Sequence, residues 1–269
     1  MKPGAYKLTE AEYHESAEYD AIHAGDFKHM EKSMQHFIWH RRHPPQKDVF
    51  DVGRMLHLLV LEPHKFHDRL AVFDGRRQGK KWEAFKEEHA GKTILKPDDF
   101  NLIQRMANAV QQHPVARAII NHKDAVIEES LFWYDPASGE KCKCRPDIRI
   151  GSEKLVADLK GVVSAGRPAF SKACAQYGYQ YQAPFYLDGA TNAMSEHDTF
   201  LFIAVEKQPP HGVQVFQANH EFVETGRIKY QTLLMDYAEC KINGRFPGYP
   251  EEIQELSLPK WATFIDLEN

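Results

Sequence analysis

The sequence is poor in cysteine, has no long apolar run and shows no excess of positive charge. Four cysteines in 269 residues are too few for a disulfide scaffold, so we expect free thiols. No segment approaches the roughly eighteen consecutive apolar residues that a transmembrane helix needs. Residues 1–15 lack the apolar stretch of a secretory signal peptide. These absences predict a cytoplasmic protein with no membrane partner.

The charge balance by itself does not identify a partner. The chain has 34 Lys and Arg against 38 Asp and Glu, a net charge of −4, whereas a non-specific DNA binder presents several cations to phosphate groups. The basic residues are clustered, however, and GRRQGKK (75–81) lacks the spacing of a phosphate-binding loop. We expect this segment to be a basic loop that contacts DNA phosphate, with solvated surface charge as the alternative. The residues concerned are Arg76, Arg77, Lys80 and Lys81.

The apolar pattern indicates an α/β fold. Hydrophobic residues make up 42% of the chain and charged residues 27%, as in globular proteins. We expect helices over residues 51–62, 100–110, 167–189 and 221–241, and strands over 125–134, 141–150, 154–160, 199–207 and 213–218. The first three strands are joined by short turns and form an antiparallel meander. The order of elements predicts a single domain, 1–269, in which a mixed sheet is flanked by helices. Residues 1–124 are its mostly helical part, 125–245 its core and 246–269 a C-terminal tail.

Two aspartates and a lysine converge on this meander. Alternate side chains of a strand share a face, so Asp158 and Lys160 point the same way. Asp147 lies at the far end of the preceding strand, where a tight hairpin brings it beside Asp158. Paired carboxylates suit hard cations such as Mg²⁺ or Mn²⁺, and a lysine beside a metal-bound water can orient or deprotonate it. Two surface acids with a salt-bridging lysine are the alternative, because short patterns of this kind also occur by chance.

The pattern Pro146-Asp147 followed by Asp158-x-Lys160 resembles the PD-(D/E)xK nuclease superfamily. Longer stretches resemble its RecE-type exonucleases, the nuclease part of exodeoxyribonuclease VIII. These stretches are GRMLHLLVLEP (53–63), EESLFWYDPASGEKCKCRPD (128–147), DLKGV (158–162), YGYQYQAPFYLDG (177–189) and SLPKWA (257–262). The resemblance spans nearly the whole chain. It implies a restriction-endonuclease-like nuclease core at residues 125–245, preceded by the helical part.

The resemblance also implies a role for each matching acidic or basic residue. Asp147 and Asp158 match the two metal-binding acids, and His57 matches a helical histidine placed at the metal. Lys160 matches the catalytic lysine. Glu128 matches the family's glutamate at the start of the strand that precedes the turn. The resemblance therefore implies that Glu128 is a further catalytic residue.

Two residues of the following helix complete the resemblance. Gln182 and Tyr186 match a Gln-x-x-x-Tyr signature, whose spacing places both side chains on one helix face. The sequence departs from the family after Lys160, where Gly161 and Val162 replace the expected threonines. We therefore expect a supporting hydrogen bond near Lys160 to be missing.

Several of these residues also fit a purely structural role. A histidine inside the apolar run MLHLLVL is often a core residue, so His57 alone would not indicate a metal site. Strand alternation lets only one of Glu128 and Glu129 face the site, and the resemblance favours Glu128. Cys142-x-Cys144 has no second ligand pair nearby and is a poor zinc site.

The resemblance implies an exonuclease that uses Mg²⁺, with Mn²⁺ able to substitute. Such an enzyme degrades one strand of linear double-stranded DNA from the 5′ end and leaves a 3′ single strand for an annealing protein. A ring-shaped homo-oligomer is also implied. One alternative is an endonuclease or single-strand nuclease of the same fold, but those usually carry an iron–sulfur cysteine cluster that is absent here. Another is an inactive DNA-binding relative, against which the intact Asp147, Asp158 and Lys160 argue.

Overall fold

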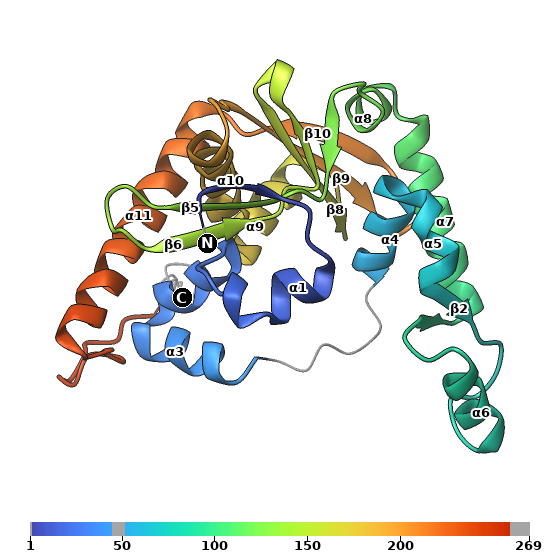
Figure 1. Cartoon of the computed structure of the whole chain (residues 1–269), viewed down its shortest axis with the longest axis horizontal. Helices are drawn as coiled ribbons and strands as arrows, with labels where there is room; N and C mark the ends of the chain where they lie inside the picture. Colours follow the sequence, from blue (N-terminus) through green and yellow to red (C-terminus); the bar gives the residue numbers. More distant parts are fainter. Residues whose placement is uncertain (1, 45–51, 259–269) are drawn as a thin grey trace, which may run out of the picture.

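The computed structural model describes residues 2–44 and 52–258 of the chain. Within these residues, helices flank a five-stranded mixed sheet, and a three-stranded sheet adjoins it (Figure 1). The order in the larger sheet is β10 (Val213–Gln217), β9 (Thr199–Glu206), β8 (Leu155–Val162), β7 (Ile148–Ile150) and β4 (Ala125–Ile127). Strands β8 and β9 run parallel, and the other neighbouring pairs are antiparallel. The predicted α/β architecture is therefore confirmed.

Helices cover both faces of this sheet because its strands alternate apolar side chains between the two faces. In β8, Val156 belongs to one hydrophobic core, whereas Ala157 and Leu159 belong to the other. The first core is covered by α9 (Arg167–Tyr177), α10 (Tyr179–Ala193) and α11 (His220–Asn243). The second is covered by α4 (Val52–Leu61), α7 (Pro97–Gln112) and α8 (Pro114–Ile120). Side chains of β8 can therefore contact both helical layers, one formed by α9, α10 and α11 and the other by α4, α7 and α8.

Two of the predicted strands are each divided between the two sheets. The expected strand 125–134 breaks at Glu128 into β4 and β5 (Ser130–Tyr134), and the expected strand 141–150 breaks at 145–147 into β6 (Lys141–Cys144) and β7. Strands β5 and β6 join β1 (Gly4–Tyr6) in the smaller sheet. The predicted antiparallel pairings are confirmed, because β5 pairs with β6, β4 with β7 and β7 with β8. The prediction of a single continuous meander is wrong: the chain passes from one sheet to the other at Glu128 and again just before β7.

The predicted helix over 167–189 is also divided. Gly178 adopts a left-handed conformation with a φ of +79° and separates α9 from α10. A Cβ atom at this position would lie 2.9 Å from the side chain of Lys28, so glycine is needed for both conformation and space. Helices α4, α7 and α11 and strands β9 and β10 match their predicted segments closely.

Residues 70–96 form a projection that we call the arm (Figure 1). It consists of β2 (Leu70–Val72), α6 (Lys80–Glu88) and β3 (Thr93–Leu95), and it lies between α5 (Pro63–Arg69) and α7. The N-terminal region adds α1 (Glu10–Glu15), α2 (Phe27–Lys32) and α3 (Met34–Arg42). None of the helices in the described part of the chain is both long and apolar enough to cross a membrane.

Candidate metal centre

Glu128 and Asp147 lie where the chain changes sheets. Glu128 has a φ of +52°, a left-handed conformation that is unfavourable for a residue with a side chain. Its backbone N–H donates to the carbonyl oxygen of Asp147 at 3.2 Å, which ties the two strand breaks together. Strained backbone of this kind is often found at functional sites. The two breaks bring both carboxyl groups to the same place.

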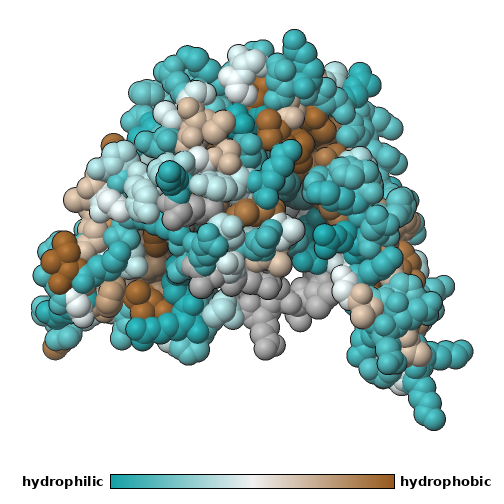
Figure 2. Space-filling view, viewed as in Figure 1, coloured by the Kyte–Doolittle hydropathy of each residue, from teal (hydrophilic) through white to brown (hydrophobic). Residues whose placement is uncertain are grey.

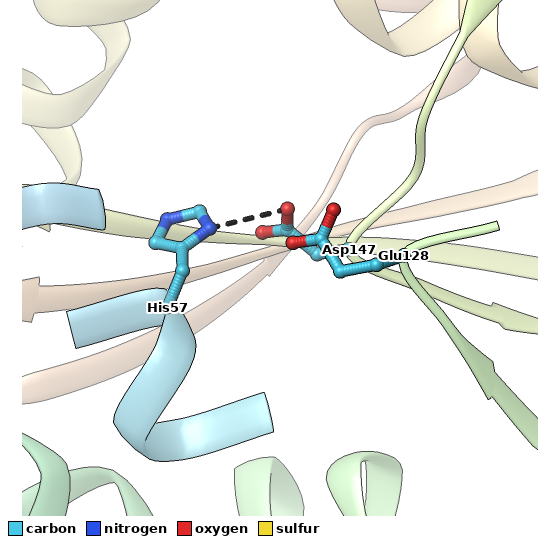
Figure 3. Close-up of side chains that lie close together, drawn as sticks. All are labelled: His57, Glu128 and Asp147. Carbon is cyan, nitrogen blue, oxygen red and sulfur yellow. Dashed lines mark ion pairs between the residues drawn. The ribbon is translucent and has the colours of Figure 1, made fainter. Parts of the chain in front are cut away.

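His57 completes this group from the helical layer. Its Nδ1 lies 3.2 Å from Oδ1 of Asp147, and Figure 3 shows the imidazole directed at the two carboxyl groups. One ligand atom from each of His57, Glu128 and Asp147 lies within 4.8 Å of the others. The His57 side chain is 26% exposed, so it is not the enclosed core histidine that the apolar run MLHLLVL would also allow.

The β7–β8 hairpin places the second aspartate and the lysine beside this group. Ile148 pairs with Ala157, so Asp147 comes next to Asp158. The backbone N–H of Leu159 donates to Oδ2 of Asp147 at 2.6 Å. Nζ of Lys160 lies 2.6 Å from Oδ2 of Asp158, so these two side chains share a strand face as predicted.

Helix α10 supplies the other neighbours of Asp158 and Lys160. Gln182 is buried, and its amide Nε2 donates a short hydrogen bond to Oδ1 of Asp158. Tyr186 follows Gln182 one helical turn later. Burial raises the pKa of its hydroxyl group well above the usual value, and the nearby Tyr13 and Asp158 add to this shift. Nζ of Lys160 lies 4.5 Å from the ring centroid of Tyr179, the first residue of α10.

The neighbouring acidic residue, Glu129, is engaged elsewhere. Its Oε2 accepts a hydrogen bond from Nε of Arg149 at 2.9 Å and a second from Nη2 at 2.5 Å. Arg149 is itself buried in β7. Of the two glutamates that the sequence leaves open, it is therefore Glu128 that lies at the aspartates.

Burial and mutual repulsion shift the titration of this cluster. Burial, followed by the negative Asp147, raises the pKa of Glu128 to about 8 and that of Asp158 to about 6. Burial alone would also raise the pKa of Asp147, but His57 and then Lys160 hold it below its usual value. Burial lowers the pKa of His57, yet Asp147 and then Asp158 outweigh burial and raise it to about 9. The carboxyl groups therefore raise the proton affinity of one another and of the imidazole.

This set of side chains fits a divalent cation. Carboxylate oxygens with one imidazole are a donor set that Mg²⁺ and Mn²⁺ accept. His57, Glu128 and Asp147 form the group of potential ligands within the described residues, and Asp158 lies beside Asp147. A bound cation would also compensate the repulsion that keeps Glu128 and Asp158 partly protonated.

The remaining predicted residues lie elsewhere. Arg76, Arg77, Lys80 and Lys81 are on the arm. The four cysteines are free thiols, and Cys142 and Cys144 are buried in the core. Residues 259–262 of the SLPKWA segment lie outside the described residues.

Two residues near the site carry no signal of their own in the sequence. Tyr179 is one of several tyrosines that pattern alone assigns to packing. Nε and Nη2 of Arg145 donate to Oγ of Ser130 at 2.9 and 2.7 Å, and Nη2 also reaches the carbonyl oxygen of Leu8 at 3.1 Å. Arg145, two residues before Asp147, thus links β5 to the N-terminal segment. In the sequence, only its position next to the Pro146-Asp147 motif indicates that Arg145 lies near the site.

The fold and the clustered acids with their lysine define a PD-(D/E)xK-like domain. The chain belongs to the family described as "PDDEXK-like domain of unknown function" (DUF3799), which matches residues 24–259. None of the curated proteins matches the chain in sequence.

Solved structures are similar to the chain at low sequence identity. One is a protein from Eubacterium rectale described as a "putative exonuclease", with a TM-score of 0.60 and 12% identity over 89% of this chain and 88% of that one. Another is SSO0001, with a TM-score of 0.29 and 14% identity over 66% of this chain and 85% of that one. The first likeness supports the fold assignment, and the second is too distant to add to it.

Proposed function

We propose that this protein is a metal-dependent exonuclease that degrades linear double-stranded DNA from the 5′ end. The observation that carries the proposal is the meeting of Asp147, Asp158 and Lys160 with His57 and Glu128 where the two sheets join. Exonuclease rather than endonuclease action is supported by the RecE-type resemblance and by the description of the Eubacterium rectale protein. The remaining 3′ strand would pass to an annealing protein, and a ring-shaped homo-oligomer would hold the duplex.

The reaction would be hydrolysis of a phosphodiester bond by in-line attack. Water adds to phosphorus, the bond to the leaving 3′ oxygen breaks, and a proton reaches that oxygen. Asp147, His57 and Glu128, with Asp158 adjacent, would hold Mg²⁺ or Mn²⁺. A divalent cation bound there supplies the acidity that makes water a nucleophile at neutral pH and offsets charge on the phosphate.

The chain's own residues would orient the reactants. Lys160 has its ammonium group against Asp158, so it would present a positive charge to the attacking water and to the charge that develops on phosphate. Gln182 fixes Asp158 through its amide and would keep that carboxylate in one orientation. Positioned groups of this type contribute about 10²–10⁴-fold to rate.

End-labelled DNA tests the proposal directly. Linear duplexes labelled at the 5′ or the 3′ end are incubated with Mg²⁺, beside a closed circular duplex, and Lys160→Ala serves as the inactive control. We expect early release of the 5′ label, retention of the 3′ label and an intact circle. Cleavage of the circle would indicate an endonuclease, and binding without any cleavage would indicate an inactive relative.

A further inference from the structure

The arm carries a concentration of positive charge that the metal centre does not use. Residues 70–96 contain seven Lys or Arg and four Asp or Glu, although the whole chain has 34 and 38. A local excess of cations in an acidic protein indicates a surface that attracts an anionic partner. Figure 2 shows the arm as a projection with a largely hydrophilic surface.

Three of the arm's cations are not neutralised by the arm's own acids. Lys86 pairs with Glu83 at 2.7 Å. Within the described residues, Arg76, Lys80 and Lys81 have no carboxylate within 4.0 Å. Lys80 and Lys81 lie in the first turn of α6, where the helix dipole disfavours positive charge, so they do not stabilise the helix. Because Lys80 and Lys81 do not stabilise the fold, we attribute to them a role in binding a partner.

A shallow, open pocket lies beside these cations in the arm. It has a volume of about 500 Å³ and is lined by Gly75, Arg76, Arg77, Gln78 and Lys96. Three cationic side chains around one concave surface suit the oxygens of a phosphate group. Lys80 and Lys81 follow within a few residues, so the cationic surface continues beyond the pocket.

Aromatic side chains hold this surface in place. Phe73 contacts Trp82 and Phe85, with ring centroids 5.2 and 4.9 Å apart. Nη2 of Arg77 donates to the carbonyl oxygen of Ile94 at 2.7 Å, and its guanidinium lies 5.5 Å from the Trp82 ring. The loop before α6 is thus fixed to β3 although no residue of α6 is buried.

The base of the arm is joined to the helix that carries His57. Leu70 and Leu95 form a small core with Phe66, Ile103 and Met55 of α4. Met55 is two residues from His57, so the core at the base of the arm also includes the helix that carries His57. The arm and the metal centre are thus attached to the same helix.

We infer that the arm binds the phosphate backbone of duplex DNA outside the bond being cut, through Arg76, Lys80, Lys81 and the pocket that includes Lys96. This inference rests on the proposed nuclease function. Backbone contacts are independent of sequence and release counterions. The arm would strengthen binding of the duplex and leave the chemical step unchanged.

The test compares two variants that lose the same charge. The arm variant is Arg76→Gln, Lys80→Gln, Lys81→Gln; Arg77 is kept because it anchors the loop. The control variant is Lys32→Gln, Lys123→Gln, Lys229→Gln, which removes three exposed cations elsewhere. Affinity for a fluorescent linear duplex is measured by anisotropy in EDTA over a series of KCl concentrations. Single-turnover cleavage with Mg²⁺ is measured at saturating DNA, and sedimentation gives the oligomeric mass.

We expect the arm variant to bind at least about tenfold more weakly at low salt and its log Kd–log[salt] slope to fall by about two to three. The control variant should show a much smaller change, and both should cut at the parent rate when saturated. Equal affinities and slopes for the two variants would overturn the inference while leaving the nuclease intact. A changed oligomeric mass in the arm variant alone would overturn it in favour of a second copy of this chain as the partner. A parent protein that neither binds nor cuts duplex DNA would overturn the proposed function and the inference together.

Discussion

At the residue scale, the ammonium group of Lys160 has two neighbours that hold it in place. The carboxylate of Asp158 lies 2.6 Å away and the ring centroid of Tyr179 4.5 Å away. The Tyr179 ring is itself packed against Phe202 and Phe170, at 6.0 and 6.3 Å. We therefore expect Tyr179 to act as a positioning residue for Lys160.

Substitution of Tyr179 tests this role. Tyr179→Leu should lower single-turnover cleavage about 2- to 30-fold, which corresponds to the roughly 0.5–2 kcal/mol of a cation–π contact. Tyr179→Phe keeps the ring and should retain most of the activity. In a Lys160→Met background, Tyr179→Leu should have no further effect, whereas a purely structural role would lower the rate in both backgrounds.

The adjacent glutamates provide a matched pair of variants. Glu128→Gln should weaken Mn²⁺ binding in calorimetry and reduce cleavage, because Glu128 lies with His57 and Asp147. Glu129→Gln removes the partner of Arg149 and should lower the free energy of unfolding by about 1–3 kcal/mol. Its Mn²⁺ affinity should remain at the parent value. If Glu129→Gln lost the metal and Glu128→Gln did not, the assignment of the two side chains would be reversed.

At the scale of elements, the strand break at Glu128 has an energetic cost. A φ of +52° is accessible to glycine without strain but costs about 1 kcal/mol or more for a residue with a Cβ atom. Glu128→Gly should therefore unfold at higher urea concentration than Glu128→Ala, although both lack the carboxylate. Equal midpoints would show that the left-handed conformation carries no strain.

The elements differ in how far the sequence predicts them. Helix α11 follows from the helical spacing of its buried residues, which lie on one face. Strands β9 and β10 are predictable because each stays within one sheet along its whole length and carries apolar side chains for both cores. The breaks at Glu128 and before β7 escape prediction because each polar interruption is only two or three residues long and apolar residues resume directly after it. The pair Asp158 and Lys160 follows from strand alternation alone. The approach of His57 and Tyr179 depends on how helices pack on the sheet, which no local pattern encodes.

At the scale of the whole molecule, the metal centre couples stability to pH. The raised pKa of His57, about 9, means that its contribution to stability is complete below about 6.5 and is lost as pH rises through 9. The raised pKa of Glu128, about 8, acts in the same direction, because the folded state holds a proton that the unfolded state releases near 4.5. The pKa of Asp158 is raised only to about 6, so this residue lowers the stability of the folded state mainly as the pH rises toward 6. Between pH 6 and 9, therefore, these groups destabilise the metal-free protein as pH rises.

A divalent cation should reverse this trend, because it binds the neutral imidazole and the ionised carboxylates. We expect the Tm in EDTA to be lower at pH 8.5 than at pH 6, and Mn²⁺ to raise the Tm more at pH 8.5 than at pH 6. Differential scanning fluorimetry at the two pH values, with EDTA or Mn²⁺, measures both effects. Glu128→Gln is the control: it removes one of the titrating groups, so its Tm in EDTA should fall less between the two pH values, and Mn²⁺ should stabilise it less. An equal Mn²⁺ effect at both pH values in the parent protein would mean that the cation does not bind at this cluster.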